Sequence, residues 1–454
     1  MFKVTELISA TGGRVVHAGG SANVRTVSID SRAIRRDEAF LAIPGKNFDG
    51  HDFIPQAIRK GVGCVIVQKG RRVVRPGSAA VIEVADTVAA LGSIARFHRR
   101  RFNIPVIAIT GSNGKTTTKD MLAWVLSGEY KTLKNEGTKN NHIGVPVTLL
   151  QLEGSHECAV LELGTNHFGE IAYLSGICEP TMAIITNIGP SHLEYFKDCA
   201  GVLKEKMNIF KFLKKPCIGI LNADDPFLGK YALSPKKTPV FVGFGIDRAC
   251  DFRARDIRRD THGFGFEMQD GARLRLSTPG RSNIYNALAS IAVCRMLGMD
   301  YPAIAARLKN FVFPCGRLTV RRLKDTCFID DTYNANPRSM GLAMEALRSF
   351  RTGGRRVLVM GDMLELGSGA EGFHRDAGML AAESCDILIT VGKHTLAAAA
   401  AAVSSGFDKT SVFTCATSAQ AKDILFRKVA VKKDDIVLLK GSRGMKLEQI
   451  LESV

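Results

Sequence analysis

The 454-residue sequence has no long apolar run, no paired-cysteine motif and only one tryptophan. A membrane-spanning helix needs about 20 consecutive apolar residues, and no apolar run here approaches that length. The first residues, MFKVTELISATGG, also lack the apolar segment that a signal peptide requires. The sequence therefore predicts a protein with neither a membrane span nor a secretion signal.

The 11 cysteines are scattered singly along the chain, with no C-x-x-C pair and no spacing typical of metal ligands. Disulfide frameworks and structural zinc sites both depend on grouped cysteines. The distribution indicates a reducing compartment, and we expect the protein to reside in the cytoplasm.

Positive charge is in excess. The chain has 62 Lys and Arg and 44 Asp and Glu, which gives a formal net charge of +18. Half of this excess, +9, falls in residues 1–101, whereas residues 102–313 carry +5 and residues 314–454 carry +4. A basic chain of this kind suggests a polyanionic partner, and one hypothesis is a nucleic-acid-dependent ATPase or a nucleic-acid-binding protein. Aromatic residues are only 7% of the chain and Trp124 is the sole Trp, so few side chains could stack on bases.

Short apolar runs typical of strands alternate with helical patterns along the whole chain, which favours an α/β fold with parallel sheets. Breaks near residues 103 and 313 divide it into three domains. We expect an N-terminal α/β domain at 1–103, a central ATPase-type domain with a mostly parallel sheet at 104–313, and a Rossmann-like C-terminal domain at 314–454. Strands are predicted at 106–110, 159–163, 183–186, 357–360, 387–391 and 436–439.

The clearest chemical motif is IAITGSNGKTTT at 107–118, which predicts a strand, a glycine turn and then a helix over 116–127. Backbone amides at such a helix start bind phosphate, a lysine neutralises it, and a following threonine can ligate Mg²⁺. The loop is shorter than G-x-x-x-x-G-K-[ST], because the first Gly of that pattern would fall at Ile109. An ordinary glycine turn is the alternative, but the full motif predicts an ATP site formed by Gly111, Ser112, Asn113, Gly114, Lys115, Thr116 and Thr117.

Two further polar residues follow predicted strands of the same sheet. Glu162 lies at the end of one strand, and His192 comes shortly after another. Because ligand sites of parallel sheets lie at the carboxyl ends of the strands, Glu162 is predicted to be a second Mg²⁺ ligand with Thr116. His192 is either a loop histidine or a ligand of another ion.

The segment KEKMNIF at 204–210 is typical of a solvated helix face. Composition alone gives no reason for Lys206 to face a phosphate.

Taken together and in this order, a set of motifs resembles the Mur ligases of peptidoglycan synthesis. They are TGSNGKTT at 110–117, LELGTN at 161–166, SHLEYF at 191–196, KMNIF at 206–210, LNADDP at 221–226, NIYN at 283–286, GR at 316–317, DDTYNANP at 330–337 and KGSRG at 440–444. The segments SIDSR at 28–32, AFLAIPG at 39–45 and FDGHDF at 48–53 resemble the UDP-substrate domain of the same family. Within the family, the motifs are most similar to the branch that adds D-alanyl-D-alanine.

The resemblance implies an ATP- and Mg²⁺-dependent ligase that activates the terminal carboxylate of UDP-N-acetylmuramoyl-tripeptide as an acyl phosphate, which the amine of D-alanyl-D-alanine then attacks. Lys115, Glu162, His192 and Lys206 would be catalytic, and the last three would hold metal with Thr116. Lys206 would be N-carbamylated, as in many members, which converts a cation into an oxygen ligand. The enzyme would work as a monomer, with no nucleic acid or membrane partner.

The resemblance also implies a set of binding residues. Adenine and ribose contacts would come from Asn283, Arg317 and Asp331, and the uridine nucleotide would meet Ser31 and Arg32. Asn140, Asn141, Asn334 and Asn336 would contact the peptide substrates. From the residues alone, Asn283 could instead cap a helix, Arg317 could be a surface charge, and Ser31 and Arg32 could belong to a structural turn.

In two places the sequence departs from the family pattern. Gly137 is followed by Thr138 where Asn is more usual, which affects the loop carrying Asn140 and Asn141, and RDE stands at 36–38 where Pro-Gly is usual. The main competing hypothesis is the sister ligase that adds the third amino acid, but its Asp-Asn-Pro-Arg motif is absent and Asn336 begins only a partial match. An inactive family-like partner protein is a third hypothesis, which the intact site residues disfavour.

Overall fold

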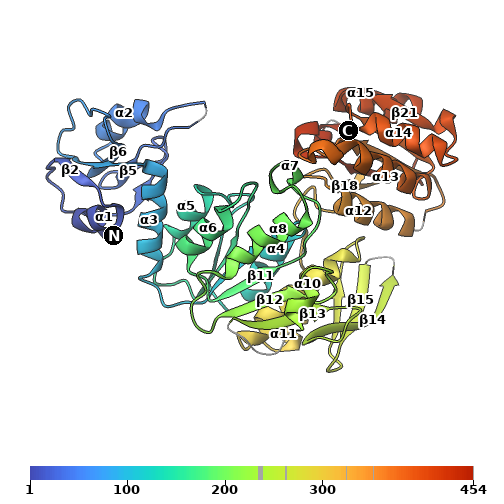
Figure 1. Cartoon of the computed structure of the whole chain (residues 1–454), viewed down its shortest axis with the longest axis horizontal. Helices are drawn as coiled ribbons and strands as arrows, with labels where there is room; N and C mark the ends of the chain where they lie inside the picture. The colour runs from blue at the N-terminus through green and yellow to red at the C-terminus, as the bar shows by residue number, and fades with distance from the viewer. Residues whose placement is uncertain (46, 234–238, 261–262, 324, 351, 453–454) are drawn as a thin grey trace.

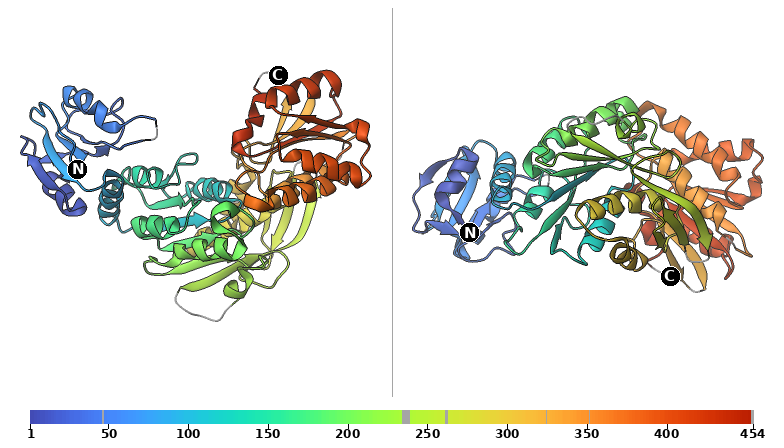
Figure 2. Two further views of the ribbon diagram at one scale, coloured as in Figure 1. Left: turned by 45° about the horizontal axis from the view of Figure 1, so that its top comes forward. Right: turned by 90° about the horizontal axis from the view of Figure 1, so that it is seen from below.

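The computed structural model describes residues 1–45, 47–233, 239–260, 263–323, 325–350 and 352–452. The chain forms three lobes, each built around its own sheet, and we name them the N-terminal, central and C-terminal lobes (Figure 1). The N-terminal and C-terminal lobes lie at opposite ends of the central lobe, as the rotated views also show (Figure 2). Mixed α/β lobes with largely parallel sheets are the predicted fold class.

The N-terminal lobe contains a five-stranded sheet in the order β2-β7-β6-β5-β4, with β2 antiparallel and the other pairs parallel. A short ladder of β1 and β3 lies beside it. Its elements are β1 (Phe2–Lys3), α1 (Val4–Thr11), β2 (Arg14–His17), β3 (Asn23–Val24), β4 (Val27–Ser28), β5 (Ala39–Leu41), α2 (Ile54–Arg59), β6 (Cys64–Gln68), β7 (Ala80–Val84) and α3 (Thr87–Arg99).

Helix α3 joins the N-terminal lobe to the central lobe. It packs on α1 on one side and on α5 and α6 on the other. Its Arg96 donates two hydrogen bonds to the buried carboxylate of Glu179, and Arg100, which follows the helix, donates two more, at 2.5–3.1 Å. These contacts attach the lobes through a helix rather than through a loose linker.

The central lobe contains a nine-stranded sheet in the order β16-β15-β14-β13-β12-β11-β8-β10-β9. Neighbouring strands in the stretch β14-β13-β12-β11-β8-β10-β9 are parallel. Strands β14, β15 and β16 pair in antiparallel fashion and extend the sheet at one edge. Its strands are β8 (Val106–Thr110), β9 (Thr132–Lys134), β10 (Cys158–Glu162), β11 (Met182–Ile185), β12 (Ile218–Asn222), β13 (Val240–Gly245), β14 (Phe252–Asp260), β15 (Gly263–Met268) and β16 (Arg273–Leu276).

Helices cover both faces of the central sheet (Figure 1), and every residue of β8, β10 and β11 is buried. Strands buried on both faces read as continuous apolar runs, which is why the sequence predicts them well. The helices are α4 (Lys115–Leu126), α5 (Gly144–Leu149), α6 (Glu170–Cys178), α7 (Leu193–Phe196), α8 (Cys199–Met207), α9 (Gly229–Ala232), α10 (Ser282–Met296) and α11 (Tyr301–Lys309).

The C-terminal lobe contains a six-stranded sheet in the order β17-β18-β22-β19-β20-β21, parallel except for the edge strand β17. Its strands are β17 (Thr319–Leu323), β18 (Thr326–Asp331), β19 (Arg356–Gly361), β20 (Ile387–Val391), β21 (Val412–Cys415) and β22 (Ile436–Lys440). Its helices are α12 (Pro337–Ser349), α13 (Ala370–Ala382), α14 (Thr395–Ser404) and α15 (Ser418–Asp423).

The six predicted strands are present, with ends shifted by no more than one residue, and the predicted helix after the glycine turn is α4. All 11 cysteines lie within the described ranges and are free thiols. Among the helices of the described residues, none is both long and apolar enough to span a membrane.

Candidate active site

The glycine turn after β8 is held open by contacts to the segment that follows β11. Asn187 accepts the backbone N–H of Asn113 through Oδ1 at 3.0 Å and that of Ser112 through its carbonyl oxygen at 2.9 Å. Helix α4 then begins at Lys115 with Gly114 as its N-cap and no side-chain cap. The N–H groups of its first turn therefore remain available to an anion, the requirement for a phosphate-binding loop.

Two glycines of this turn have no substitute. Gly111 has φ +150°, and a Cβ there would lie 1.9 Å from Oγ1 of Thr186. Gly114 has φ +81°, and a Cβ would lie 2.4 Å from Oδ1 of Asn286. Both a left-handed backbone and close packing thus require glycine at these positions.

Strand order explains why Glu162 meets the phosphate loop. Strand β10 pairs with β8 so that Glu162 lies opposite Ile109, and both strands run parallel. Glu162 is 1% exposed, and its Oε1 accepts a hydrogen bond from Nδ2 of Asn140 at 2.8 Å. Its Oε2 is buried without a hydrogen-bond partner among the described residues.

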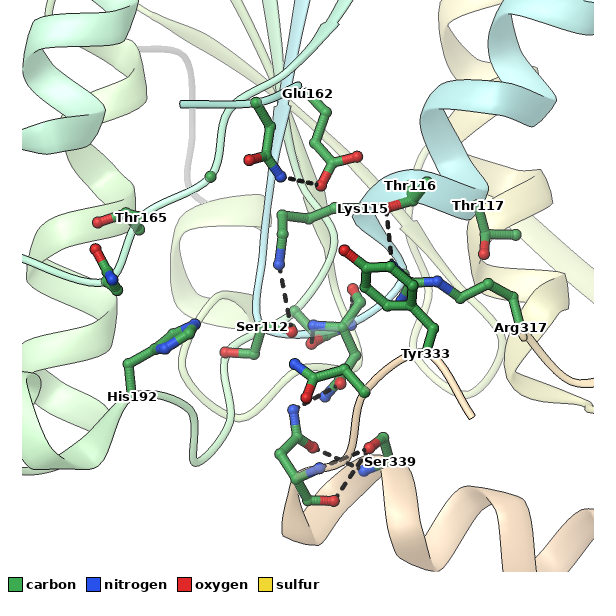
Figure 3. Close-up of a pocket in the computed structure, with 18 of the residues that line it drawn as sticks. Ser112, Lys115, Thr116, Thr117, Glu162, Thr165, His192, Arg317, Tyr333 and Ser339 are labelled. Atoms are coloured by element: carbon green, nitrogen blue, oxygen red, sulfur yellow. Dashed lines mark hydrogen bonds between the residues drawn. The ribbon is translucent and has the colours of Figure 1, made fainter. Parts of the chain in front are cut away.

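Lys115 points into the same space (Figure 3). Its Nζ donates to the carbonyl oxygen of Gly111 at 2.7 Å. Burial lowers the pKa of Lys115, the carboxylate of Glu162 opposes that shift, and the nearby guanidinium of Arg317 adds to it. The carboxylate and the two cations are therefore close enough to influence one another.

Lys206 is buried, so the solvated helix face expected from composition is wrong for this residue. It lies near the end of α8 and is 1% exposed. Burial and the charge of Lys115 hold the pKa of Lys206 well below its usual range, against the opposing effect of Glu205 and Glu162. Its Nζ makes no hydrogen bond or ion pair within the described part of the chain. Its neighbour Glu205 accepts the N–H groups of Gly169 and Ile171, at the start of α6.

His192 is the N-cap of the short helix α7 and has a left-handed backbone, φ 52°. Its Nδ1 lies 2.5 Å from Oε2 of Glu365, a residue of the C-terminal lobe. His192 also lines the cavity that contains Lys115 and Glu162.

The C-terminal lobe reaches the phosphate loop through Arg317. Its Nη2 donates to Oγ1 of Thr116 at 3.1 Å, and its guanidinium lies 3.8 Å from the ring centroid of Tyr333 (Figure 3). A cation stacked in this way is both oriented and partly desolvated. Arg317 is therefore part of the site and not a free surface charge.

Two more side chains of the same lobe contact the central lobe. Asn336 donates from Nδ2 to Oδ1 of Asn113 at 2.8 Å. Arg338 donates from Nη1 to the buried carboxylate of Asp225 and to the carbonyl oxygen of Ile188, both at 3.0 Å. Together with Arg317, these residues hold α12 against the loops around the phosphate turn.

At the end of β18, Asp331 forms a buried ion pair of 2.5 Å with Lys440, and its Oδ1 accepts the N–H of Leu318 at 3.2 Å. Lys440 also donates to the carbonyl oxygen of Asn334 at 3.0 Å. Asp331 thus has both a cation and an N–H donor as partners at this strand end.

Most of these residues line one cavity of about 1070 Å³ between the lobes, but Lys206, predicted to be catalytic, is not among the residues on its lining. The predicted site residues on its lining are Ser112, Asn113, Gly114, Lys115, Thr116, Thr117, Asn140, Asn141, Glu162, His192, Asn283, Arg317, Asp331, Asn334 and Asn336. Asn283 lies inside α10 and not at its cap, because the helix begins at Ser282. Its side chain instead bonds to Thr278 and Asn286, so the capping alternative is wrong.

Ser31 and Arg32 do not line this cavity; from the N-terminal lobe only Pro44 and Gly45 do, among the described residues. Oγ of Ser31 donates to Oε1 of Gln56 at 3.0 Å, and Arg32 forms an exposed ion pair with Asp30. Both residues therefore lie outside the lining of the main cavity. Their contact with the uridine nucleotide stays a prediction.

The donors present fit a divalent cation. Mg²⁺ prefers oxygen ligands and keeps several waters or phosphate oxygens, and the unpartnered Oε2 of Glu162 and the hydroxyl of Thr116 are donors of this kind. The described residues contain no cluster of three or more His, Cys, Asp and Glu side chains that could enclose a metal. A cation here would therefore depend on substrate oxygens as well as on the protein.

Family models match the chain along most of its length. A model described as Mur ligase family, catalytic domain, matches residues 23–99; the Mur ligase middle domain matches 109–294; and the Mur ligase, glutamate ligase domain, matches 316–443. The chain belongs to the Mur ligase family.

Several similar Mur ligases carry the same enzyme name. UDP-N-acetylmuramoyl-tripeptide--D-alanyl-D-alanine ligase of Bacillus subtilis is 35% identical over 95% of this chain and 93% of its own length. The Escherichia coli enzyme of that name is also 35% identical, over 96% and 95%. Among solved structures, MurF from Acinetobacter baumannii superposes with a TM-score of 0.89 at 33% identity, covering 99% of this chain and 98% of that one. MurF ligase from Thermotoga maritima in complex with ADP gives 0.82 at 30% identity, covering 94% and 96%.

Sequence reasoning missed several residues of this Mur ligase site, among them Asn187, Asn286, Tyr333, Arg338, Glu365 and Lys440. Asn187 directly follows the strand end at 183–186, so its position was a usable signal. Arg338 and Glu365 gave no such signal, because their partners lie 113 and 173 residues away in sequence.

Proposed function

We propose that this Mur ligase joins D-alanyl-D-alanine to UDP-N-acetylmuramoyl-tripeptide in an ATP-dependent reaction that forms an amide bond in peptidoglycan precursor synthesis. The observation that carries the proposal is full-length similarity to ligases of that name, at 35% identity, combined with a phosphate loop and a buried carboxylate in one cavity. ATP is the nucleotide, in keeping with the ADP complex of the Thermotoga maritima relative.

In the proposed first step, the terminal carboxylate of the tripeptide attacks the γ-phosphorus of ATP. A carboxylate oxygen forms the new bond, the bond from phosphorus to the ADP oxygen breaks, and an acyl phosphate results. Lys115 neutralises charge on the transferring phosphoryl group, and the first-turn N–H groups of α4 hold the phosphates. Arg317, oriented by Tyr333 and bonded to Thr116, adds positive charge from the other lobe.

In the second step, the neutral amine of D-alanyl-D-alanine attacks the acyl carbon and phosphate leaves. The amine loses one proton as the amide forms, and the released phosphate or solvent takes it up. A closed cavity between lobes protects the acyl phosphate from water during this step, and the contacts of Asn336 and Arg338 to the central lobe support such closure.

Mg²⁺ is part of the proposal, with Thr116 and Glu162 as its protein ligands, and it would neutralise charge on the phosphate oxygens. His192 and Lys206 would hold a second ion. Lys206 suits N-carbamylation, because a lysine with a strongly lowered pKa presents a neutral amine that can add to carbon dioxide.

The remaining subsites are assigned by their positions. Asn283 and Asp331, together with Arg317, would contact the adenosine of ATP, and Asn140 and Asn141 the muramoyl peptide. Asn334 and Asn336, on the C-terminal lobe, would receive D-alanyl-D-alanine, while Ser31 and Arg32 in the basic N-terminal lobe would meet the UDP group.

We propose domain boundaries near 103 and 313. Residues 1–103 would bind the UDP substrate, residues 104–313 would bind ATP, and residues 314–454 would close over both. The enzyme would work as a monomer in the cytoplasm. The free cysteines suit the reducing conditions of the cytoplasm.

A phosphate-release assay with three arms tests the function. The first arm supplies UDP-N-acetylmuramoyl-tripeptides that differ at residue three, the second omits D-alanyl-D-alanine, and the third replaces both substrates with DNA or RNA. We expect sustained phosphate release and a UDP-pentapeptide product only when tripeptide and D-alanyl-D-alanine are both present. Stimulation by nucleic acid alone in the third arm would overturn the ligase assignment. In a separate assay, activity with UDP-dipeptide and a single amino acid would identify the sister reaction instead.

A further inference from the structure

The contact between His192 and Glu365 links the central lobe to the C-terminal lobe at the edge of the catalytic cavity. His192 precedes α7 in the central lobe, whereas Glu365 follows β19 in the C-terminal lobe. Their side chains approach to 2.5 Å between Nδ1 and Oε2. The backbone supports the same contact, since the N–H of Glu194 donates to the carbonyl oxygen of Glu365 at 3.4 Å.

Local geometry on both sides is shaped around this contact. His192 has φ 52° and Glu365 has φ 61°, both in the left-handed region that non-glycine residues rarely occupy. Such conformations persist only where surrounding structure holds them, and they concentrate at functional sites. Gly367 also has a positive φ, and a Cβ added there would lie 3.4 Å from the Cα of Glu194. The two loops therefore pack closely at this point.

The chemistry of the pair fixes which ring nitrogen is free. An ionised carboxylate only accepts hydrogen bonds, so Nδ1 of His192 must carry the proton that it donates to Glu365. In the neutral ring, Nε2 then holds the lone pair. Within the described residues, Nε2 of His192 makes no hydrogen bond, and the residue lines the cavity.

We propose that Glu365 is a positioning residue that holds His192 with Nε2 ready to bind a divalent cation in the cavity. A carboxylate behind a metal-binding histidine sets the tautomer and the ring orientation. Because Glu365 belongs to the other lobe, the histidine is oriented only while the C-terminal lobe is docked. The cation site is therefore completed only when the C-terminal lobe docks on the central lobe. This inference rests on the metal site of the proposed function.

The experiment uses the full-length enzyme and three variants. Glu365→Leu removes the acceptor, and Glu365→Gln keeps an oxygen that can accept from Nδ1. Glu371→Leu is the matched control, because Glu371 is an exposed glutamate of the same lobe whose ion-pair partner is Arg375. Mn²⁺ is titrated in the presence of ADP, and bound ion is counted from the loss of the free Mn²⁺ resonance signal.

Because the proposed function includes two ions, we expect Glu365→Leu to weaken one of two Mn²⁺ binding steps by about 10–100-fold, Glu365→Gln to weaken that step less, and Glu371→Leu to leave both steps unchanged. Unchanged Mn²⁺ affinity in a folded Glu365→Leu variant would overturn the proposal. If that variant does not fold, an affinity of Glu365→Gln below that of wild type supports the proposal, and wild-type affinity contradicts it.

A second readout does not depend on metal. Ring-nitrogen NMR of the wild type, assigned with a His192→Gln variant, should show His192 with a protonated Nδ1 and an unprotonated Nε2. The opposite tautomer would contradict the proposal. Absence of any Mn²⁺ binding by the wild type would instead remove the metal site of the proposed function, so the two failures are distinguishable.

Discussion

At the scale of single residues, the site depends on buried charges that have few partners. Within the described residues, Lys115 has only backbone carbonyls as hydrogen-bond acceptors, Lys206 has no acceptor, and Oε2 of Glu162 has no hydrogen-bond partner. Burying such groups costs free energy unless something binds them. The burial of these charged groups is therefore best explained by anionic and cationic ligands that bind to them.

Lys115→Ala should abolish turnover while leaving the fold intact. The substitution removes the ammonium that neutralises the transferring phosphoryl group, and loss of one such electrostatic contact typically costs about 10²–10³-fold or more in kcat. Phosphate release and the thermal midpoint are the measurements. Lys131→Ala, at an exposed lysine paired with Glu153, is the control; near-normal turnover of Lys115→Ala would refute the phosphate role.

Lys206→Ala should lose activity by a similar factor and regain part of it when a short-chain carboxylate such as acetate is added. The added carboxylate would supply the oxygen that a carbamylated lysine would present. Lys204→Ala, at the exposed lysine two residues earlier on α8, should keep wild-type activity with or without acetate. Full activity of Lys206→Ala in the absence of acetate would remove Lys206 from the site.

At the scale of elements, α3 and α4 illustrate two ways in which a helix serves the site. Helix α4 begins without a side-chain cap and so presents free N–H groups. Helix α3 carries no catalytic residue but fixes the N-terminal lobe through Glu179. Burial alone would raise the pKa of Glu179, but hydrogen bonds from Arg100 and Arg96 outweigh it and hold the pKa at about 2.

Glu179→Gln should lower the free energy of unfolding at neutral pH by roughly 2–3 kcal/mol, because the partly exposed Arg96 and Arg100 lose the buried carboxylate that pairs with them. The pKa of Glu179 is depressed in the folded state from its ordinary 4.5 to about 2, so its contribution is present above about pH 4.5 and is lost as pH falls toward 2. Thermal midpoints of wild type and variant should differ by a constant amount from pH 8 to about 5.5 and approach each other as the pH falls from about 4.5 toward 2. Glu153→Gln, at an exposed glutamate, should show no such difference; a pH-independent gap for Glu179→Gln would contradict the assignment.

At the scale of the whole molecule, the catalytic cavity exists because the central and C-terminal lobes meet. Arg317, Asn336, Arg338 and Glu365 all cross between them. Charge is distributed on the same scale, since half of the +18 excess lies in the N-terminal residues 1–101. That surplus suits attraction of an anionic UDP substrate.

Arg338→Ala should loosen the docked arrangement of the lobes, because it removes the only cation that pairs with the buried Asp225 among the described residues. We expect a larger radius of gyration by solution scattering in the absence of substrate, and kcat reduced by about tenfold because closure positions the reacting groups. Arg348→Ala, on the same helix and paired with the exposed Glu383, is the matched control. An unchanged scattering profile for Arg338→Ala would contradict the docking role.

Much of this organisation could be predicted from sequence, for physical reasons. Strands β8, β10 and β11 are buried on both faces, so their apolar runs were readable, and polar residues at their ends identified Glu162 and the phosphate loop. The burial of Lys206 could not be predicted, because its flanking charges read as solvated. Contacts such as His192 with Glu365 depend on how two lobes dock, and nothing in local sequence encodes that.

Transfer of ¹⁸O from the tripeptide carboxylate to phosphate shows whether ligation proceeds through an acyl phosphate. The tripeptide substrate is labelled with ¹⁸O in its terminal carboxylate and incubated with ATP and D-alanyl-D-alanine. If the carboxylate attacks the γ-phosphorus, the oxygen that it contributes remains on phosphorus when the amine displaces phosphate. We predict one ¹⁸O in each phosphate released, in equal amount to the amide product; unlabelled phosphate would contradict the account.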